Sequence, residues 1–239
     1  MIQTGGKEMI IGIIGAMEKE VAILKEQMEI SEVVEKASMT FCKGMLCGKE
    51  VVVVRSGIGK VNAAICAQIL VDRFGVDLLI NTGIAGSLNA AIDIGDIVIS
   101  KDAVQHDVDA STFGDPVGQV PNMDVLAFPA DERLAKLAKE ANEEANPDIH
   151  TFTGRIASGD QFIAESEVKQ RITERFGADC VEMEGASIAH AAYLNKIPCV
   201  ILRAISDKAD NSAEMDYPAF EQKAIEHSVR LVQNLLPRL

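Results

Sequence analysis

The sequence has no tryptophan and few aromatic residues, with two tyrosines and eight phenylalanines among 239 residues. Hydrophobic residues nevertheless make up 48% of the chain, so a sizeable core must be built mainly from Ile, Val, Leu, Ala and Met. This aliphatic bias is typical of a β-sheet that helices cover on both faces. The length alone permits one large domain or two small ones.

Positive charge is also scarce. The chain has 23 Lys and Arg against 36 Asp and Glu, which gives a formal net charge of -13, and the basic residues form no run. Such a chain repels phosphate backbones and anionic membrane surfaces. The composition therefore argues against nucleic acid or a charged membrane as a partner.

Long apolar runs are missing as well. The longest runs are the size of strands, such as VVVV at 51–54, whereas a transmembrane helix needs roughly 20 apolar residues. The first residues, MIQTGGKE, are polar and lack the apolar core of a signal peptide. We therefore expect no membrane partner and a cytoplasmic location.

The cysteines form an odd, scattered set. Cys42 and Cys47 are the only close pair, and no second pair or histidine cluster joins them to complete a zinc site. We expect all five cysteines to be free, buried thiols in a reducing compartment, and we expect no bound metal.

Short β-branched runs alternate with longer helical stretches along the chain. The expected strands cover 10–14, 51–55, 77–82, 94–100, 151–158, 179–183 and 198–204. The expected helices cover 17–28, 60–74, 131–145, 165–176, 184–196 and 216–236. This alternation predicts one α/β domain in three layers, with helices on both sides of a mixed, mostly parallel central sheet. The polar segment 101–130 is expected to be a long functional or interfacial loop.

Ligands of open α/β sheets bind beyond the carboxyl ends of the strands, and two early motifs follow such ends. In GIIGAMEKE (12–20), Glu18 and Glu20 fall in the first turn of a helix, where the helix dipole favours acidic residues whether or not they act on a ligand. SGIGK (56–60) lacks the Walker A spacing, and Asn62 replaces the third glycine of a dinucleotide fingerprint. A close-approach turn against a small ligand or a neighbouring chain fits SGIGK better.

Two later motifs, VEMEG and RAISD, also follow expected strands. Extended backbone would put Glu182 and Glu184 on one side and Met183 on the other, although a turn here would break that division. The two glutamates are either a solvated pair or partly enclosed by their apolar neighbours. Asp207 follows an almost wholly apolar strand. Enclosure would raise the pKa of its carboxyl, as a general acid requires, whereas a turn cap by Ser206 or Asp207 is the alternative.

Taken together, the segments GIIGAMEKE, SGIGK, NTGIAG, SGDQFI, VEMEG and RAISD resemble, in order and spacing, the 5′-methylthioadenosine/S-adenosylhomocysteine nucleosidases of the nucleoside phosphorylase superfamily. The resemblance runs from about Met9 to the C-terminus and leaves residues 1–8 as an N-terminal extension. It implies a phosphorylase/hydrolase-like fold in a single domain. It also implies a homodimer that needs no cofactor and hydrolyses methylthioadenosine, S-adenosylhomocysteine and 5′-deoxyadenosine.

The resemblance implies catalytic roles for three carboxyl groups. Glu20 would activate the attacking water, Asp207 would protonate nitrogen seven of adenine, and Glu184 would bind the ribose hydroxyls. Ser206 and Arg203 would steady Asp207 and the nearby glutamates. This division of labour requires a raised pKa for Asp207 and ionised Glu20 and Glu184.

The remaining roles concern substrate contacts. Phe162 would stack on the base while the backbone of Ile163 reads its edge. The other expected contacts are Met17, Ile58 and Tyr217 around the 5′-substituent, Met183 beneath the sugar, and Ile84, Val181 and Glu182 elsewhere in the pocket. Phe113 and Pro121 match positions that the second subunit of the dimer contributes to the pocket, which would place segment 101–130 in the dimer interface.

Two positions depart from the family pattern, and several rival functions stay open. Ile84 stands where many members have serine, and Tyr217 stands where phenylalanine is frequent. The rivals are a phosphorolytic enzyme, which would need a cation such as Arg55 or Arg203 for phosphate, a futalosine-type hydrolase, and a nucleoside-binding protein without catalysis.

Overall fold

The computed structural model describes residues 9–209 and 213–239, apart from the side chains of 213–216. Its strands are β1 Ile10–Gly15, β2 Glu29–Lys36, β3 Met39–Leu46, β4 Lys49–Arg55, β5 Leu78–Ser87, β6 Ile97–Gln105, β7 Phe128–Pro129, β8 Thr151–Ser158, β9 Cys180–Glu182 and β10 Cys199–Asp207. Its helices are α1 Glu18–Glu26, α2 Lys60–Ile69, α3 Glu132–Ala145, α4 Ser166–Phe176, α5 Gly185–Asn195 and α6 Ala213–Leu235. Shorter helical turns cover Leu70–Phe74, Ser111–Phe113 and Leu236–Arg238.

All ten strands belong to one mixed sheet in the order β10-β6-β8-β9-β5-β1-β4-β3-β2, with β7 paired to β6. Strand β10 also pairs with β5, so that half of the sheet closes on itself. The α/β class and the mixed sheet are as predicted. The parallel share was overestimated, because the ten pairings divide into five parallel and five antiparallel.

The central strands are buried on both faces, which explains their continuous apolar sequence. Residues 51–54 of β4 are all 0% exposed. Successive side chains of a strand point to opposite faces, and accordingly Val51 and Val53 pack in one core cluster while Val52 and Val54 pack in another. A strand in this position needs helices on both sides.

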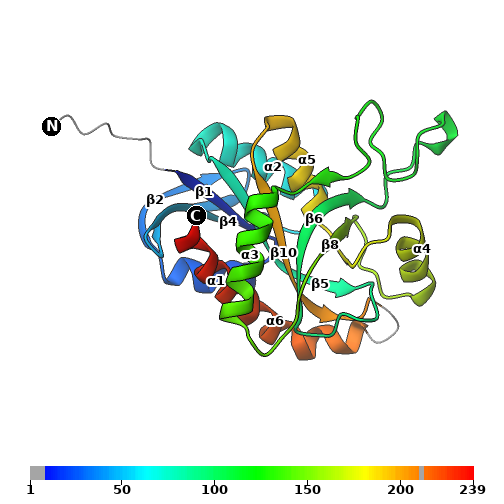
Figure 1. The fold of residues 1–239 in the computed structure, drawn as a ribbon. Coiled ribbons are helices and arrows are strands. Elements are labelled where there is room, and N and C mark those ends of the chain that lie inside the picture. The colour runs from blue at the N-terminus through cyan, green and yellow to red at the C-terminus, as the bar shows by residue number, and fades with distance from the viewer. Residues whose placement is uncertain (1–8, 210–212) are drawn as a thin grey trace.

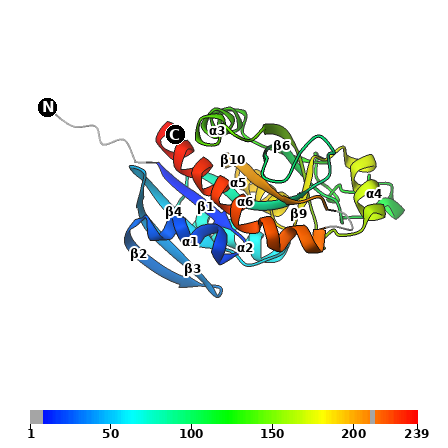
Figure 2. The ribbon, with the colours of Figure 1, turned by 90° about the horizontal axis from the view of Figure 1, so that it is seen from below.

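The helices form the two outer layers. Helices α1, α3 and α6 cover one face, where Leu24, Ala138 and Val232 join the first cluster, and Figure 2 shows α6 lying between α3 and α1. Helices α2 and α5 pack together on the opposite face, where Ala63 and Ile188 join the second cluster. The three-layer arrangement is therefore as expected. No helix among the described residues is long and apolar enough to cross a membrane.

The hairpin of β2 and β3 was missed. Seven of the eight residues of β2 are exposed, so its sequence, EISEVVEK, carries no pattern of a buried face. Gly44 of β3 lies so close to β2 that an added Cβ would be 2.2 Å from the carbonyl oxygen of Glu29. This hairpin supplies two of the antiparallel pairings.

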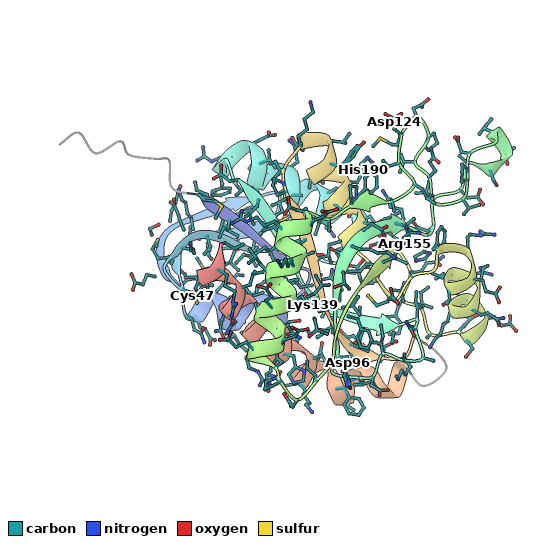
Figure 3. All side chains as sticks on the ribbon, viewed as in Figure 1. Cys47, Asp96, Asp124, Lys139, Arg155 and His190 are labelled. Carbon is teal, nitrogen blue, oxygen red and sulfur yellow. The ribbon has the colours of Figure 1, made fainter. Side chains whose placement is uncertain are left out.

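Two other expectations need correction. The cysteines are free, but Cys47 lies exposed at the turn after β3, while the other four are buried (Figure 3). The polar segment 101–130 is not wholly irregular, because β6 continues to Gln105 and β7 occupies Phe128–Pro129. Between these strands the chain projects away from the body of the molecule, as Figure 1 shows.

Candidate active site

A cavity of about 240 Å³ opens at the carboxyl ends of β1, β5, β9 and β10. Its position follows the sheet rule used in the sequence analysis. The expected site residues that line it are Met17, Glu20, Ile58, Ile84, Phe162, Val181, Glu182, Met183, Glu184, Ser206, Asp207 and Tyr217. Ala16, Ala85 and Gly86 also line the cavity and were not predicted.

Glu20 serves the start of its helix and the cavity at the same time. Its Oε2 accepts the backbone N–H groups of Ala16 at 2.7 Å and Met17 at 2.8 Å, and its Oε1 accepts that of Ile84 in β5 at 3.2 Å. Burial raises the pKa of Glu20, against the lowering effect of the Arg203 guanidinium and of these N–H groups. Glu20 can therefore stabilise the start of α1 and line the cavity at the same time.

Arg203 lies behind the cavity and does not line it. The residue is 1% exposed, and its Nη2 donates to Glu182 Oε2 at 2.5 Å and to Asn81 Oδ1 at 2.6 Å. Burial acts to lower the pKa of Arg203, but the carboxylates of Glu182, Glu20 and Glu184 raise it overall. Three carboxyl groups thus share one buried guanidinium.

Both carboxyl oxygens of Glu182 accept hydrogen bonds from other groups of the protein. Besides Arg203, its Oε2 accepts the N–H groups of Glu184 at 3.0 Å and Gly185 at 2.7 Å, which begin helix α5. Its Oε1 accepts a short hydrogen bond from the Ser158 hydroxyl. A carboxylate at a helix N-terminus is favoured by the helix dipole. Glu182 therefore organises the site more than it offers oxygens to a ligand.

Glu184 keeps more of its oxygen surface for the cavity. Its Oε1 accepts the Gly59 N–H at 2.8 Å, from the SGIGK loop before α2. Burial, and next the charge of Glu182, raises the pKa of Glu184 to about 8. Enclosure and the neighbouring carboxylates thus oppose the expected ionisation of Glu184.

Asp207 ends β10 and is 2% exposed. The Ser206 hydroxyl donates to its Oδ2 at 2.9 Å, and the Ala209 N–H donates to its Oδ1 at 2.8 Å. Asp207 therefore both caps the turn after β10 and lines the cavity, just as Glu20 has two roles. Ser206 thus contacts Asp207, whereas the described hydrogen bonds of Arg203 go to Glu182, Asn81 and the Leu202 carbonyl.

Two glycines of the NTGIAG segment let the carboxyl groups approach β5. An added Cβ on Gly83 would lie 2.5 Å from Glu20 Oε1, and one on Gly86 would lie 2.7 Å from Asp207 Oδ1. The absence of a side chain at these positions is therefore a requirement of the site. The spacing of glycines in NTGIAG was the available signal for Gly86.

Aromatic side chains border the cavity. The rings of Phe162 and Tyr217 meet edge to face, with centroids 5.9 Å apart. The Tyr217 hydroxyl lies 3.4 Å from the Met17 sulfur and donates to Glu221 at 3.1 Å. Phe162 and Ile58 are 53% and 54% exposed. The mouth of the cavity, as the described residues form it, is therefore lined by exposed apolar side chains.

Besides Arg203, three expected residues lie outside the main cavity. Ile163 lines a smaller adjoining cavity that Phe162 and Asp207 share. Phe113 lies in the projecting segment and is 89% exposed, and Pro121 is exposed in the same segment. Neither lines the pocket of its own chain, which is compatible with the expected role in a second subunit but does not test it.

This geometry can be set beside known proteins. A model of the phosphorylase superfamily matches residues 10–237. A curated 5′-methylthioadenosine/S-adenosylhomocysteine nucleosidase from Staphylococcus carnosus is 42% identical over 231 residues, which cover 96% of this chain and all of the relative. The chain belongs to this nucleosidase family of the phosphorylase superfamily.

Solved structures agree with the assignment to the nucleosidase family. A nucleosidase of this name from Colwellia psychrerythraea, in complex with adenine, superimposes with a TM-score of 0.93 at 42% identity, covering 98% of this chain and 96% of that one. A futalosine hydrolase from Helicobacter pylori is similar at a TM-score of 0.91 and 37% identity, covering 97% and 98% of the two chains. The fold is thus shared by hydrolases of two substrate specificities.

The Glu182–Arg203 pair yields a prediction about stability. Replacing Glu182 by Gln keeps the side-chain shape but leaves the buried guanidinium without its direct counter-ion. We expect Glu182→Gln to lower the free energy of unfolding by about 3 kcal/mol, since breaking a buried pair by removing one partner is costly. Urea denaturation measures the change, with exposed Glu140→Gln on α3 as the control. A loss equal to that of the control would contradict the assigned role.

Proposed function

We propose that the chain hydrolyses the N-glycosidic bond of 5′-methylthioadenosine and S-adenosylhomocysteine, and of 5′-deoxyadenosine, releasing adenine and the 5′-substituted sugar. As a member of the nucleosidase family, the chain is an N-glycosyl hydrolase. The observation that carries the substrate and mechanism is the set of enclosed carboxyl groups, Glu20, Glu184 and Asp207, around one cavity with an apolar mouth.

Asp207 is the proposed acid. An adenine anion leaves poorly, and protonation of the ring lets it depart as a neutral molecule, which a positioned acid accelerates by about 10²–10⁴-fold. Asp207 is enclosed at the end of β10, and contacts with Ser206 and Ala209 fix the orientation of its carboxyl group. Phe162 and the backbone of Ile163, which lie beside the same space, bind the base.

Glu184 and Glu20 act on the sugar side. Departure of the base leaves an oxocarbenium-like sugar, which nearby negative charge stabilises. Glu184 binds the ribose hydroxyls, and Met183, its neighbour in the cavity wall, lies beneath the sugar. Glu20 accepts a proton from the attacking water. The positive charge that develops on the sugar favours ionisation of both glutamates, against the burial that raises their pKa values.

The 5′-substituent occupies the apolar mouth formed by Met17, Ile58 and Tyr217, with Ile84, Val181 and Glu182 completing the wall. We propose that a second copy of the chain covers this mouth. Ile58 and Phe162 are more than half exposed there, and the exposed Phe113 and Pro121 lie on the projecting segment, where they can reach a partner's pocket.

Water, and not phosphate, is the proposed acceptor of the sugar. Among the residues that the structure describes around the cavity, none is Lys or Arg. Arg203 is occupied by Glu182 and Asn81 behind the wall, and Arg55 is half-exposed beside Glu18. A phosphate ion would instead face the carboxyl groups of the pocket, which repel it.

Turnover without phosphate tests the proposed function directly. We expect purified protein to release adenine from methylthioadenosine in phosphate-free buffer, with no further rate increase when phosphate is added, because the pocket wall provides no cation for it. Chromatography of adenine and the sugar product measures this. Release only in the presence of phosphate, or a strong preference for futalosine in a competition assay, would overturn the proposal.

The acid role predicts the behaviour of Asp207→Asn. We expect kcat to fall by at least about 10²-fold, because the amide has no proton of suitable acidity to give to the base. Binding of methylthioadenosine, measured by calorimetry before appreciable turnover, should persist because the side-chain shape is kept. The exposed Asp148→Asn is the control for handling. Turnover of Asp207→Asn near that of the unaltered protein would refute the assignment.

The proposed base role of Glu20 predicts different effects for substitutions of the two glutamates in the first turn of α1. Glu20→Gln should lose at least about 10²-fold in kcat, since an amide cannot take a proton from water. Glu18→Gln should stay close to the unaltered protein, because the Glu18 side chain is 53% exposed and pairs with Lys25. Steady-state kinetics of the two variants show which glutamate acts as the base. An inactive Glu18→Gln together with an active Glu20→Gln would assign that role to Glu18.

A further inference from the structure

Three charged residues that the catalytic roles leave unused meet outside the cavity. Lys60 belongs to the SGIGK loop, Asp107 follows β6, and Asp160 belongs to the SGDQF segment after β8. They are far apart in the sequence, yet each contacts the other two. We call this group the Lys60–Asp107–Asp160 ring.

The ring consists of three hydrogen bonds. Asp160 Oδ1 accepts the backbone N–H of Lys60 at 2.8 Å. Lys60 Nζ donates to Asp107 Oδ1 at 2.6 Å, and Asp107 Oδ2 accepts the backbone N–H of Asp160 at 2.9 Å. Three segments, the SGIGK loop, the turn after β6 and the turn after β8, are thereby joined through both side-chain and backbone groups.

The Lys60–Asp107 pair of the ring is more enclosed than an ordinary surface ion pair, while Asp160 is exposed. The side chains of Lys60 and Asp107 are 17% and 20% exposed, so solvent screens their attraction less than it screens exposed pairs. Although burial acts to raise it, the Lys60 ammonium and the Asp160 N–H hold the pKa of Asp107 below its usual value. Lys60 Nζ also reaches Gln105 Oε1 at 3.2 Å, and Gln105 contacts His190 of α5.

The loop that the ring holds carries a contact to the active site. Gly59 N–H donates to Glu184 Oε1, and the next N–H along the chain, that of Lys60, donates to Asp160. Gly59 has a φ of +96°, and an added Cβ would lie 3.0 Å from Asp160 Oδ1. Two consecutive N–H groups thus bind two carboxylates, Glu184 inside the cavity and Asp160 outside it.

We infer that Asp160 is a positioning residue for the reaction: through the ring, it keeps the Gly59 N–H directed at Glu184. The inference rests on the proposed function, in which ionised Glu184 binds the ribose. It gives a role to the lysine of SGIGK and to the aspartate of SGDQF, which neither phosphate binding nor the carboxyl chemistry explains.

The direction in which the pKa of Glu184 changes can show whether Asp160 acts by positioning the Gly59 N–H or only through its own charge. Glu184 faces Glu20 from α1, Glu182 from β9 and Arg203 from β10, besides Gly59. The two glutamates raise the pKa of Glu184, while the guanidinium and the Gly59 N–H lower it. Loss of that N–H would raise the pKa further. Loss of the Asp160 charge with the Gly59 contact kept would not raise it, because removal of a negative charge does not disfavour ionisation.

A pair of Asp160 variants uses this difference. Ionised Glu184 is required, so kcat/KM falls as pH falls through its pKa, which is about 8 in the free site. Asp160→Ala removes the acceptor of the Lys60 N–H, and we expect its acidic limb to move to higher pH. Near neutral pH, kcat/KM should drop by about tenfold or more. Asp160→Asn keeps an acceptor oxygen, and its limb should stay at or slightly below that of the unaltered protein.

The experiment measures kcat/KM for methylthioadenosine against pH for both variants, with exposed Asp148→Ala as control. A limb for Asp160→Ala that stays in place or moves to lower pH would overturn the inference, as would equal defects in Asp160→Ala and Asp160→Asn. Thermal unfolding of the variants confirms that the compared proteins are folded.

Amide hydrogen exchange supplies a readout that needs no turnover. In the ligand-free protein, Asp160→Ala should speed exchange in a peptide covering residues 57–62, while Asp160→Asn and the control should not. Unchanged exchange in Asp160→Ala would contradict the ring as the anchor of this loop. If the unaltered protein released no adenine, the proposed function would be wrong. The exchange experiment would still test whether the Lys60–Asp107–Asp160 ring anchors the loop, because it needs no turnover.

Discussion

The arrangement of the site depends on one buried positive charge. Arg203 lies in a strand that is buried along its whole length, and its guanidinium is 1% exposed. A buried charge is tolerated only when it is paired and hydrogen-bonded. Glu182 meets that requirement, and the same carboxylate binds the first N–H groups of α5. The demand of one cation therefore fixes where α5 begins, and with it where Glu184 enters the cavity.

Three carboxyl groups surround the single guanidinium of Arg203, and this excess of acidic groups suits the proposed chemistry. Glu20 and Glu184 share with Glu182 the attraction of a single guanidinium, and burial raises the pKa of both. A pocket of this kind is short of positive charge. A sugar that becomes cationic as its base departs supplies that charge at the moment of the transition state, where stabilisation accelerates a reaction.

Sequence reasoning succeeded where burial and sheet topology decide position. The apolar β10 placed Asp207, and the first strand end placed Glu20. It failed for β2, whose exposed residues carry no periodic signal. It overestimated the parallel share of the sheet because it missed the hairpin and because β6 and β9 run antiparallel to β10 and β5. It could not connect Lys60 with Asp107 and Asp160, because contacts between loops depend on the folded path of the chain and not on local pattern.

The hydrogen bonds to the three glutamates also explain how identical carboxyl groups take different tasks. Glu182 accepts four bonds from the protein, and Glu20 accepts three N–H groups. Glu184 accepts one, from Gly59, among the bonds of the described residues. A carboxylate offers about four lone-pair sites, so Glu184 retains the most capacity for the two hydroxyls of a ribose. Glu20 keeps little beyond one position, which is what a single water requires.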